Sequence, residues 1–381
     1  MDHFGLSEDL AELRETVAAF ARDKIAPVIG DFYARHEFPY EIIAQMGSMG
    51  LFGLAFPEEF GGMGGDYLAH CLAIEEIARV DSSVAITLEA AISLGAMPIF
   101  KWGTEEQKQR WLPDLVAGRK LAGFGLTEPG AGSDAGGTRT TAKLSDDGRE
   151  WIINGTKSFI TNSGTEITAL VTVTALTGPD EISTIIVPSG TPGFTVAPGY
   201  DKVGWCASDT HELSFDNVRV PVENLLGERG RGFKQFLTIL DEGRVAIAAL
   251  ATGLAQGCVD ESVAYARQRE AFGSPISAYQ AVSFMIAEME TSAQTARLAW
   301  RDAALRLVAG QPIRNAAAIA KLYAGDAAMT NARKATQIHG GYGFMNEFPV
   351  GRFYRDAKIL EVGEGTSEIQ KMVISRELGL S

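Results

Sequence analysis

The chain has 381 residues, 46% of them hydrophobic and 22% charged, a composition typical of a globular enzyme with about two or three domains. Its formal net charge of -14 argues against extended binding to nucleic acid or to an acidic membrane, although a local basic pocket stays compatible with it. The 3 cysteines and 5 histidines show no ligand spacing, so neither a disulfide framework nor a metal site is expected.

The N-terminal segment has no basic region followed by an apolar core, so no secretory signal is predicted. The longest uncharged apolar stretch, residues 245–256, is too short to cross a bilayer. We therefore expect a cytoplasmic protein of bacterial type that does not bind membranes.

Residues 1–121 are predicted to form a helical domain. In residues 7–25 apolar side chains recur at helical spacing, with Ser7 as N-cap and Pro27 closing the segment. Further helices are predicted at 40–49, 67–80, 82–100 and 104–116.

Residues 122–228 have a different pattern, which predicts a small β-domain. Asn154-Gly155 lies between two apolar runs, a strong signal for a hairpin with a type I′ turn. Short β-branched runs separated by turn residues follow at 169–174, 183–187, 194–197 and 212–215.

Residues 229–381 return to helical periodicity. Long amphipathic stretches at 233–266, 277–308, 312–339 and 366–376 predict a helical bundle. The predicted fold is therefore mostly α-helical with a β middle domain.

Glu364 stands between Gly363 and Gly365 in the run VGEGTSEIQ. A backbone rich in glycine can turn sharply and approach a ligand closely. A carboxylate shielded there from water has a raised pKa, as a general base near neutral pH requires. The alternative is an ordinary helix start capped by Thr366 or Ser367.

The run TEPGAGSDAGG, residues 127–137, is rich in glycine and hydroxyl groups but is not the GxGxxG motif of a Rossmann fold. Its exposed backbone N–H groups suit the polar edge of a planar cofactor or a phosphate. Alternatively, it only connects the helical part to the β-domain.

Five motifs together resemble the acyl-CoA dehydrogenase family, the FAD enzymes that desaturate acyl-CoA thioesters. They are GFGLTEPGAGSD, NGTKSFITN, RQREAFG, QIHGGYGF and EGTSEIQ, and the resemblance covers essentially the whole chain. It implies an N-terminal helical domain, a small β-barrel or sandwich, and a C-terminal four-helix bundle.

The resemblance also implies two groups of FAD-binding residues. One surrounds the flavin ring, with Thr127 near its edge, an aromatic at position 159 covering it and Thr161 directed toward N5: Phe124, Leu126, Thr127, Gly132, Ser133, Phe159, Thr161, Thr366 and Glu368. The other holds the pyrophosphate and adenosine of a neighbouring subunit's FAD: Arg269, Phe272, Gln280, Gln337, Gly340 and Gly341. A homo-oligomer follows, usually a tetramer built as a dimer of dimers, although Arg269 alone would read as a solvated helix charge.

By the same resemblance, Glu364 takes the α-proton of the thioester while the β-hydrogen passes as hydride to flavin N5, giving a trans-2-enoyl-CoA. The thioester oxygen accepts from the Glu364 N–H and a ribityl hydroxyl of FAD. Electrons then pass to an electron-transfer flavoprotein. The implied substrate residues are Ser133, Asp241, Arg244 and Gly365. Arg244 could instead simply pair with Asp241 at the surface.

Some relatives, of the isovaleryl and long-chain types, carry the base at the position that is Gly243 here, so Glu364 is the expected base and Glu242 should point elsewhere. Residues 84–86 contain no arginine to pair a second carboxylate, which disfavours dicarboxylic substrates. Gly363 replaces a tyrosine found in many relatives, which favours a branched or bulkier acyl group. The expected substrate is a short- to medium-chain acyl-CoA. An acyl-CoA oxidase and a non-catalytic flavoprotein are the alternatives; the chain is shorter than typical oxidases.

Overall fold

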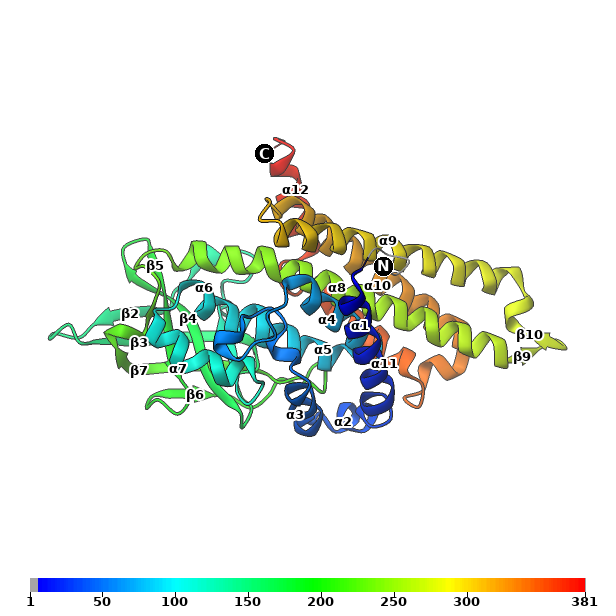
Figure 1. Cartoon of the computed structure of the whole chain (residues 1–381), viewed down its shortest axis with the longest axis horizontal. Coiled ribbons are helices and arrows are strands. Elements are labelled where there is room, and N and C mark those ends of the chain that lie inside the picture. Colours follow the sequence, from blue (N-terminus) through cyan, green and yellow to red (C-terminus); the bar gives the residue numbers. More distant parts are fainter. Residues whose placement is uncertain (1–5, 381) are drawn as a thin grey trace.

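The computed structural model describes residues 6–380, which form a helical part, a β-domain and a second helical part in chain order (Figure 1). The β-domain lies at one end of the long axis, and the hairpin of β9 (Glu270–Ala271) and β10 (Ser274–Pro275) lies at the other. Helix α8 (Gly232–Gln268) runs between these two ends. The predicted fold class, mostly helical with a β middle domain, is confirmed.

The first helical part contains the elements that the apolar spacing predicts. Ser7 caps α1 by accepting a hydrogen bond from the Leu10 backbone N–H at 3.3 Å, as expected. The short helix α2 was not anticipated. The helices are α1 (Glu8–Phe20, continued by a π-turn to Ile25), α2 (Ile29–Arg35), α3 (Tyr40–Ser48), α4 (Tyr67–Ala78), α5 (Ser82–Glu89), α6 (Met97–Trp102) and α7 (Glu105–Val116).

The single helix predicted over 82–100 is divided into α5, a π-helical segment Ala90–Ala96, and α6. Pro98 stands in the first turn of α6. A proline has no N–H to donate to the preceding turn, so regular α-helical bonding cannot run through it. The stretch Ser82–Trp102 is long and apolar enough to cross a membrane by length and composition, but 89% of its most apolar 18-residue window is buried inside the protein, as in a core helix.

The β-domain forms one sheet in the order β6-β7-β3-β2-β4-β5-β8, with β1 added parallel to β4. Trp151, Val173 and Val187 belong to a hydrophobic core of its own. The strands are β1 (Leu121–Gly125), β2 (Thr141–Leu144), β3 (Glu150–Thr161), β4 (Thr168–Gly178), β5 (Glu181–Pro188), β6 (Phe194–Val196), β7 (Thr210–Pro221) and β8 (Leu225–Leu226).

The hairpin predicted at Asn154-Gly155 is wrong. Strand β3 runs without a turn from Glu150 to Thr161 and pairs with β7 along its length. The register shifts between Ile153 and Gly155, and the Asn154 side chain accepts a hydrogen bond from the Asn217 backbone N–H at 2.8 Å. The Asn-Gly pair therefore lies at an irregularity of the ladder, where Gly155 takes a φ of 151° that glycine adopts easily.

The second helical part confirms the four predicted long helices to within a few residues of their ends. Helices α8, α9 and α10 pack against one another, and α11 packs on α8 and α10. The elements are α8 (Gly232–Gln268), β9 (Glu270–Ala271), β10 (Ser274–Pro275), α9 (Gln280–Val308), α10 (Arg314–His339), α11 (Pro349–Ala357) and α12 (Ser367–Glu377). Helix α11 was not anticipated.

Helix α8 also packs tightly against α4 of the first helical part. A Cβ atom on Gly253 would lie 2.2 Å from the Glu75 carbonyl oxygen, and one on Gly257 would lie 2.2 Å from that of Arg79. Only glycine permits this approach. Beside the contact, the buried Glu75 carboxylate accepts hydrogen bonds from Arg297 at 2.6 Å and Trp300 at 2.8 Å, both on α9.

Replacing Gly253 with alanine should lower the free energy of unfolding by about 1–3 kcal/mol, because α4 must move away from α8. Thermal unfolding followed by circular dichroism measures the effect. Gly351→Ala is the control. Gly351 lies in α11, and a Cβ atom there would have its nearest neighbour, the Gly343 carbonyl oxygen, at 3.5 Å. Alanine is also favoured over glycine in a helix by about 1 kcal/mol. Equal melting temperatures for the two variants would contradict this account.

Candidate active site

Glu364 lies on a tight turn between the 3₁₀ segment Lys358–Glu361 and helix α12. Its φ angle is 51°, in the left-handed region that residues other than glycine rarely adopt, and Gly365 follows with φ 95°. Thr366 caps α12 by accepting from the Ile369 N–H at 3.3 Å. The helix start considered as an alternative is thus present, and Glu364 lies two residues ahead of it. A strained backbone of this kind is common at functional sites.

The Glu364 carboxylate faces helix α8 at Gly243. A Cβ atom on Gly243 would lie 2.6 Å from Glu364 Oε2, so no larger side chain fits there while Glu364 holds this position. The adjacent Glu242 turns away and forms an ion pair with Lys101, as expected. Glu364 Oε2 is buried and accepts no hydrogen bond from a described N–H or hydroxyl group; the carboxyl group within hydrogen-bonding reach of Glu364 is that of Glu89.

A second carboxyl group, which the sequence did not reveal as a site residue, lies near the first. Glu89 at the end of α5 is fully buried, with no positively charged partner among the residues described. Its carboxyl group interacts with the Ser93 hydroxyl and with the Glu364 carboxyl. Its Oε1 would be 3.6 Å from a Cβ on Gly243. The sequence feature that could have indicated Glu89 is its place as the one charged residue in the apolar run VAITLEAAIS.

Burial raises the pKa of Glu364 to about 7. Burial and the nearby Glu364 charge raise the pKa of Glu89 well above its usual range. Two neighbouring buried carboxyls do not ionise together, because like charges repel strongly where water is excluded. Glu89 is therefore neutral when Glu364 carries a charge.

Asp241 and Arg244 form an ion pair on α8, with 2.5 Å between Arg244 Nη1 and Asp241 Oδ1. Arg244 is buried, so it is not the surface partner of the alternative interpretation, and its Nε has no partner among the described residues. Arg244 Nη2 would lie 3.7 Å from a Cβ on Gly365. Asp241, Arg244, Glu364 and Gly365 therefore belong to one site.

The glycine-rich loop after β1 adjoins the start of α8. The Phe124 ring stacks on Phe236 with 3.9 Å between centroids and is buried, as is Leu126. The side chains of both residues thus pack inward, and only their backbone is available to a ligand. Gly132 and Ser133 are exposed.

Phe159 near the end of β3 presents its ring to solvent. The residue is 65% exposed, has φ 61°, and its ring centroid lies 5.2 Å from that of Tyr200. Thr161, two residues on, is half-buried. An exposed aromatic held in a strained conformation, beside a loop with free backbone, fits a planar aromatic cofactor.

Glu128 fastens the glycine-rich loop at both ends, a role that the sequence did not indicate. Its carboxylate accepts hydrogen bonds from the Arg139 and Thr140 backbone N–H groups at 2.8 and 3.0 Å. Lys157 Nζ, fully buried on β3, lies 2.8 Å from Glu128 Oε1 and donates to the Leu126 carbonyl at 3.1 Å. The loop is therefore held against the strand that carries Phe159.

The remaining predicted cofactor residues lie at the opposite end of the molecule. Phe272, on the hairpin of β9 and β10, is 97% exposed. The Arg269 guanidinium lies over the Tyr342 ring, 5.8 Å from its centroid, and so joins this hairpin to the end of α10. The other members are all exposed: Gln280, Gln337, Gly340 and Gly341. We call this set, with Arg269 and Phe272, the distal group.

Helix α8 has 37 residues and is therefore about 55 Å long. The glycine-rich loop contacts its first turns, and Arg269 follows its last residue. Figure 1 shows the β-domain and the β9–β10 hairpin at opposite ends of the long axis. The two predicted groups of FAD residues thus do not meet within one chain.

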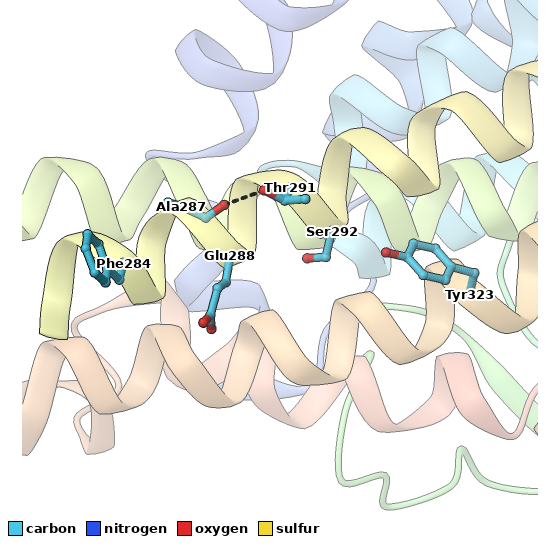
Figure 2. Close-up of a pocket in the computed structure, with 6 residues that line it drawn as sticks. All are labelled: Phe284, Ala287, Glu288, Thr291, Ser292 and Tyr323. Atoms are coloured by element: carbon cyan, nitrogen blue, oxygen red, sulfur yellow. Dashed lines mark hydrogen bonds between the residues drawn. The ribbon is translucent and has the colours of Figure 1, made fainter. Parts of the chain in front are cut away.

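Thr366 lies beside Glu364 as the cap of α12, and Glu368 is exposed in the first turn of that helix. The hollow drawn in Figure 2 lies between α9 and α10 and is lined by Phe284, Ala287, Glu288, Thr291, Ser292 and Tyr323. It contains none of the predicted site residues.

Comparison with known proteins agrees with these observations. Models of the acyl-CoA dehydrogenase N-terminal, middle and C-terminal domains match residues 7–119, 123–218 and 230–379. A probable acyl-CoA dehydrogenase, YngJ of Bacillus subtilis, is 47% identical over 99% of both chains.

Two solved structures are also similar. The butyryl-CoA dehydrogenase of Megasphaera elsdenii has a TM-score of 0.95 and 42% identity, over 99% of this chain and 100% of that one. A chain in a structure described as the electron transferring flavoprotein of Acidaminococcus fermentans has a TM-score of 0.96 and 43% identity, over 99% of both chains. The chain therefore belongs to the acyl-CoA dehydrogenase family and is an enzyme of that family.

Proposed function

We propose that this acyl-CoA dehydrogenase acts on short- to medium-chain acyl-CoA thioesters with Glu364 as the base that removes the α-proton. The observation that carries this proposal is the position of the Glu364 carboxylate: its Oε2 is buried, receives no hydrogen bond from a described N–H group, and faces Gly243 beside the Glu89 carboxyl. A desolvated carboxylate without a cationic hydrogen-bond partner is suited to accept a proton from carbon.

The pKa of Glu364, raised to about 7 by burial, suits this role. At and above neutral pH a large fraction of the carboxylate is ionised, yet its proton affinity exceeds that of an ordinary glutamate. The Glu364 backbone N–H is available to donate to the thioester oxygen, where negative charge develops as the proton leaves. Ser133, Asp241, Arg244 and Gly365 are the proposed substrate contacts.

The residues around Phe159 fit a flavin, which we propose to be FAD. A bound flavin supplies the acceptor for the β-hydrogen, which passes to it as hydride to leave a trans-2-enoyl-CoA. The chain's own contribution is to hold that ring: Phe159 covers a face, Thr127 and Thr161 offer hydroxyl groups, and Glu128 fixes the loop.

We further propose that the FAD site is completed by a second copy of the chain. The distal group is exposed and begins at Arg269, directly after the last residue of α8, whereas the glycine-rich loop contacts the first turn of this helix, which is about 55 Å long. A dinucleotide is far shorter than this helix. The distal group can therefore hold the pyrophosphate and adenosine only of a flavin bound to a neighbouring subunit, in a dimer or a tetramer built as a dimer of dimers.

The proposed electron acceptor is an electron-transfer flavoprotein, in keeping with the description of the similar chain from Acidaminococcus fermentans. The short-chain substrate is in keeping with the butyryl-CoA dehydrogenase relative. An acyl-CoA oxidase would instead reoxidise with oxygen. We propose a cytoplasmic enzyme.

Glu364→Gln should retain flavin and bind thioester but reduce the flavin about 10²–10⁴-fold more slowly, because an amide cannot accept the α-proton. Anaerobic stopped-flow mixing with butyryl-CoA follows the loss of the visible flavin band. Glu361→Gln is the control, since it removes a neighbouring carboxylate that pairs with Lys358 at 2.6 Å. Bleaching at the normal rate in Glu364→Gln would rule out the assignment.

Stopped-flow mixing also identifies the electron acceptor of the reduced flavin. After substrate reduction, the wild-type flavin should reoxidise slowly in air and rapidly with electron-transfer flavoprotein. Fast formation of peroxide would favour the oxidase.

We propose that Gly363 determines whether the enzyme accepts branched as well as straight acyl groups. A panel of straight and of α- and β-branched acyl-CoAs should show turnover of branched substrates by the wild type. Gly363→Tyr should lower kcat/KM for branched thioesters by about tenfold or more relative to straight ones, because a ring fills the added space. Gly363→Ala is the control, since its Cβ meets only Ile359, at 3.3 Å. If branching abolishes turnover in the wild type while straight chains react, the proposal is wrong.

Subunit complementation tests the shared site. Arg269→Ala should lose flavin, and Glu364→Gln should not bleach. When the two are co-expressed, mixed oligomers contain sites with an intact Glu364 from one subunit and an intact Arg269 from the other, so activity should return. Sedimentation should show an oligomer in the wild type. A monomer that retains FAD would contradict the proposal.

A further inference from the structure

Lys321 lies on α10 beneath the turn that carries Glu364. The residue is only 1% exposed, which is rare for a lysine, and its Nζ donates a hydrogen bond to the Gly365 carbonyl oxygen at 2.7 Å. It forms no ion pair with any described residue. A buried cation without a carboxylate bound to it is costly unless it serves the groups around it.

The turn is fixed on both sides of Glu364. Before it, the Gly363 N–H donates to the Ile359 carbonyl at 2.7 Å. After it, the Gly365 carbonyl accepts from both Lys321 and the buried Gln370 side chain, the latter at 2.8 Å. These bonds hold Glu364 in its left-handed conformation, which an L-residue does not favour.

The charges around Glu364 and Lys321 come from several elements. Glu89 on α5, Lys321 on α10 and Arg244 on α8 act on Glu364. Glu361 before the turn and Glu368 on α12 act on Lys321, together with Glu364 and Arg244. Arg244 pairs with Asp241 at 2.5 Å, so Lys321 is the cation near Glu364 that has no ion pair of its own among the described residues. Burial lowers the pKa of Lys321 to about 8, so the ammonium is still mostly charged at neutral pH.

We propose that Lys321 is the positioning residue of the base: it holds the Glu364–Gly365 turn through the Gly365 carbonyl and places one positive charge beside the carboxylate. The proposal rests on the function proposed above. The hydrogen bond directs the carboxylate toward Gly243, and the charge stabilises its ionised form. A base in so dry a site would otherwise hold its proton to higher pH.

The test is the pH dependence of flavin reduction by butyryl-CoA, measured anaerobically. In the wild type the rate should rise with pH as Glu364 loses its proton. Lys321→Met removes the charge and the donor, so the ionised form of Glu364 loses support and the profile should shift to higher pH. The rate at neutral pH should fall by about tenfold to a hundredfold, because the carboxylate is also less well placed.

Two variants separate the explanations. Lys321→Arg keeps a cation and should keep the wild-type profile. Lys108→Met removes a lysine charge on α7, where Lys108 pairs with Glu105 at 2.9 Å and contacts none of the site residues, and should leave rate and profile unchanged. A uniform slowing of Lys321→Met at every pH, with no shift, would overturn the proposal, as would an unchanged rate. If Lys321→Met does not fold with flavin, Lys321→Gln is judged by the same shift.

Hydrogen exchange separates this proposal from the function on which it rests. Wild-type protein that no acyl-CoA bleaches would refute the proposed function. The backbone amides of residues 363–366 should exchange faster in Lys321→Met than in the wild type, and this measurement needs no substrate. Identical exchange in the two proteins would show that Lys321 does not hold the turn.

Discussion

The close packing of α8 on α4 is the constraint on which the arrangement of the site depends. Gly253 and Gly257 let the two backbones approach to a distance that no side chain would allow. The same helix presents Gly243 to Glu364 and ends at Arg269, about 55 Å from its start. Its position therefore sets both the surface that the base faces and the separation of the two cofactor groups.

The chemistry of the site follows from removing water around several charges. Glu364 and Glu89 cannot both ionise in this environment, while Lys321 and Arg244 favour the charged form of Glu364. Burial thus raises the proton affinity of Glu364, the proposed base, and the hydrogen bond with Glu89 and the two cations limit that rise. The result is a carboxylate whose pKa is close to neutral rather than a permanently protonated acid.

Positioning in this protein relies on bonds to backbone carbonyl and N–H groups. Glu128, within the glycine-rich loop, accepts hydrogen bonds from two backbone N–H groups just after the loop, and Lys321 donates to the Gly365 carbonyl. Both are buried, and each holds a segment that carries proposed site residues. Loops gain the rigidity of the core in this way without becoming part of a helix or strand.

Local patterns determined much of the fold. Apolar spacing and caps such as Ser7 gave the helices, because helix formation depends on residues three and four apart. The motifs also gave the family and the candidate residues of the site. The hairpin prediction at Asn154-Gly155 was wrong, because this pair also suits an irregularity within a strand, and only the pairing of β3 with β7 distinguishes the two. Glu89 and Lys321 could not be recognised, since their burial beside Glu364 arises from contacts between helices far apart in the chain. The sequence by itself determined the elements and the chemical groups; the tertiary structure decided which charges lie together without water, and so which carboxylate can act as a base.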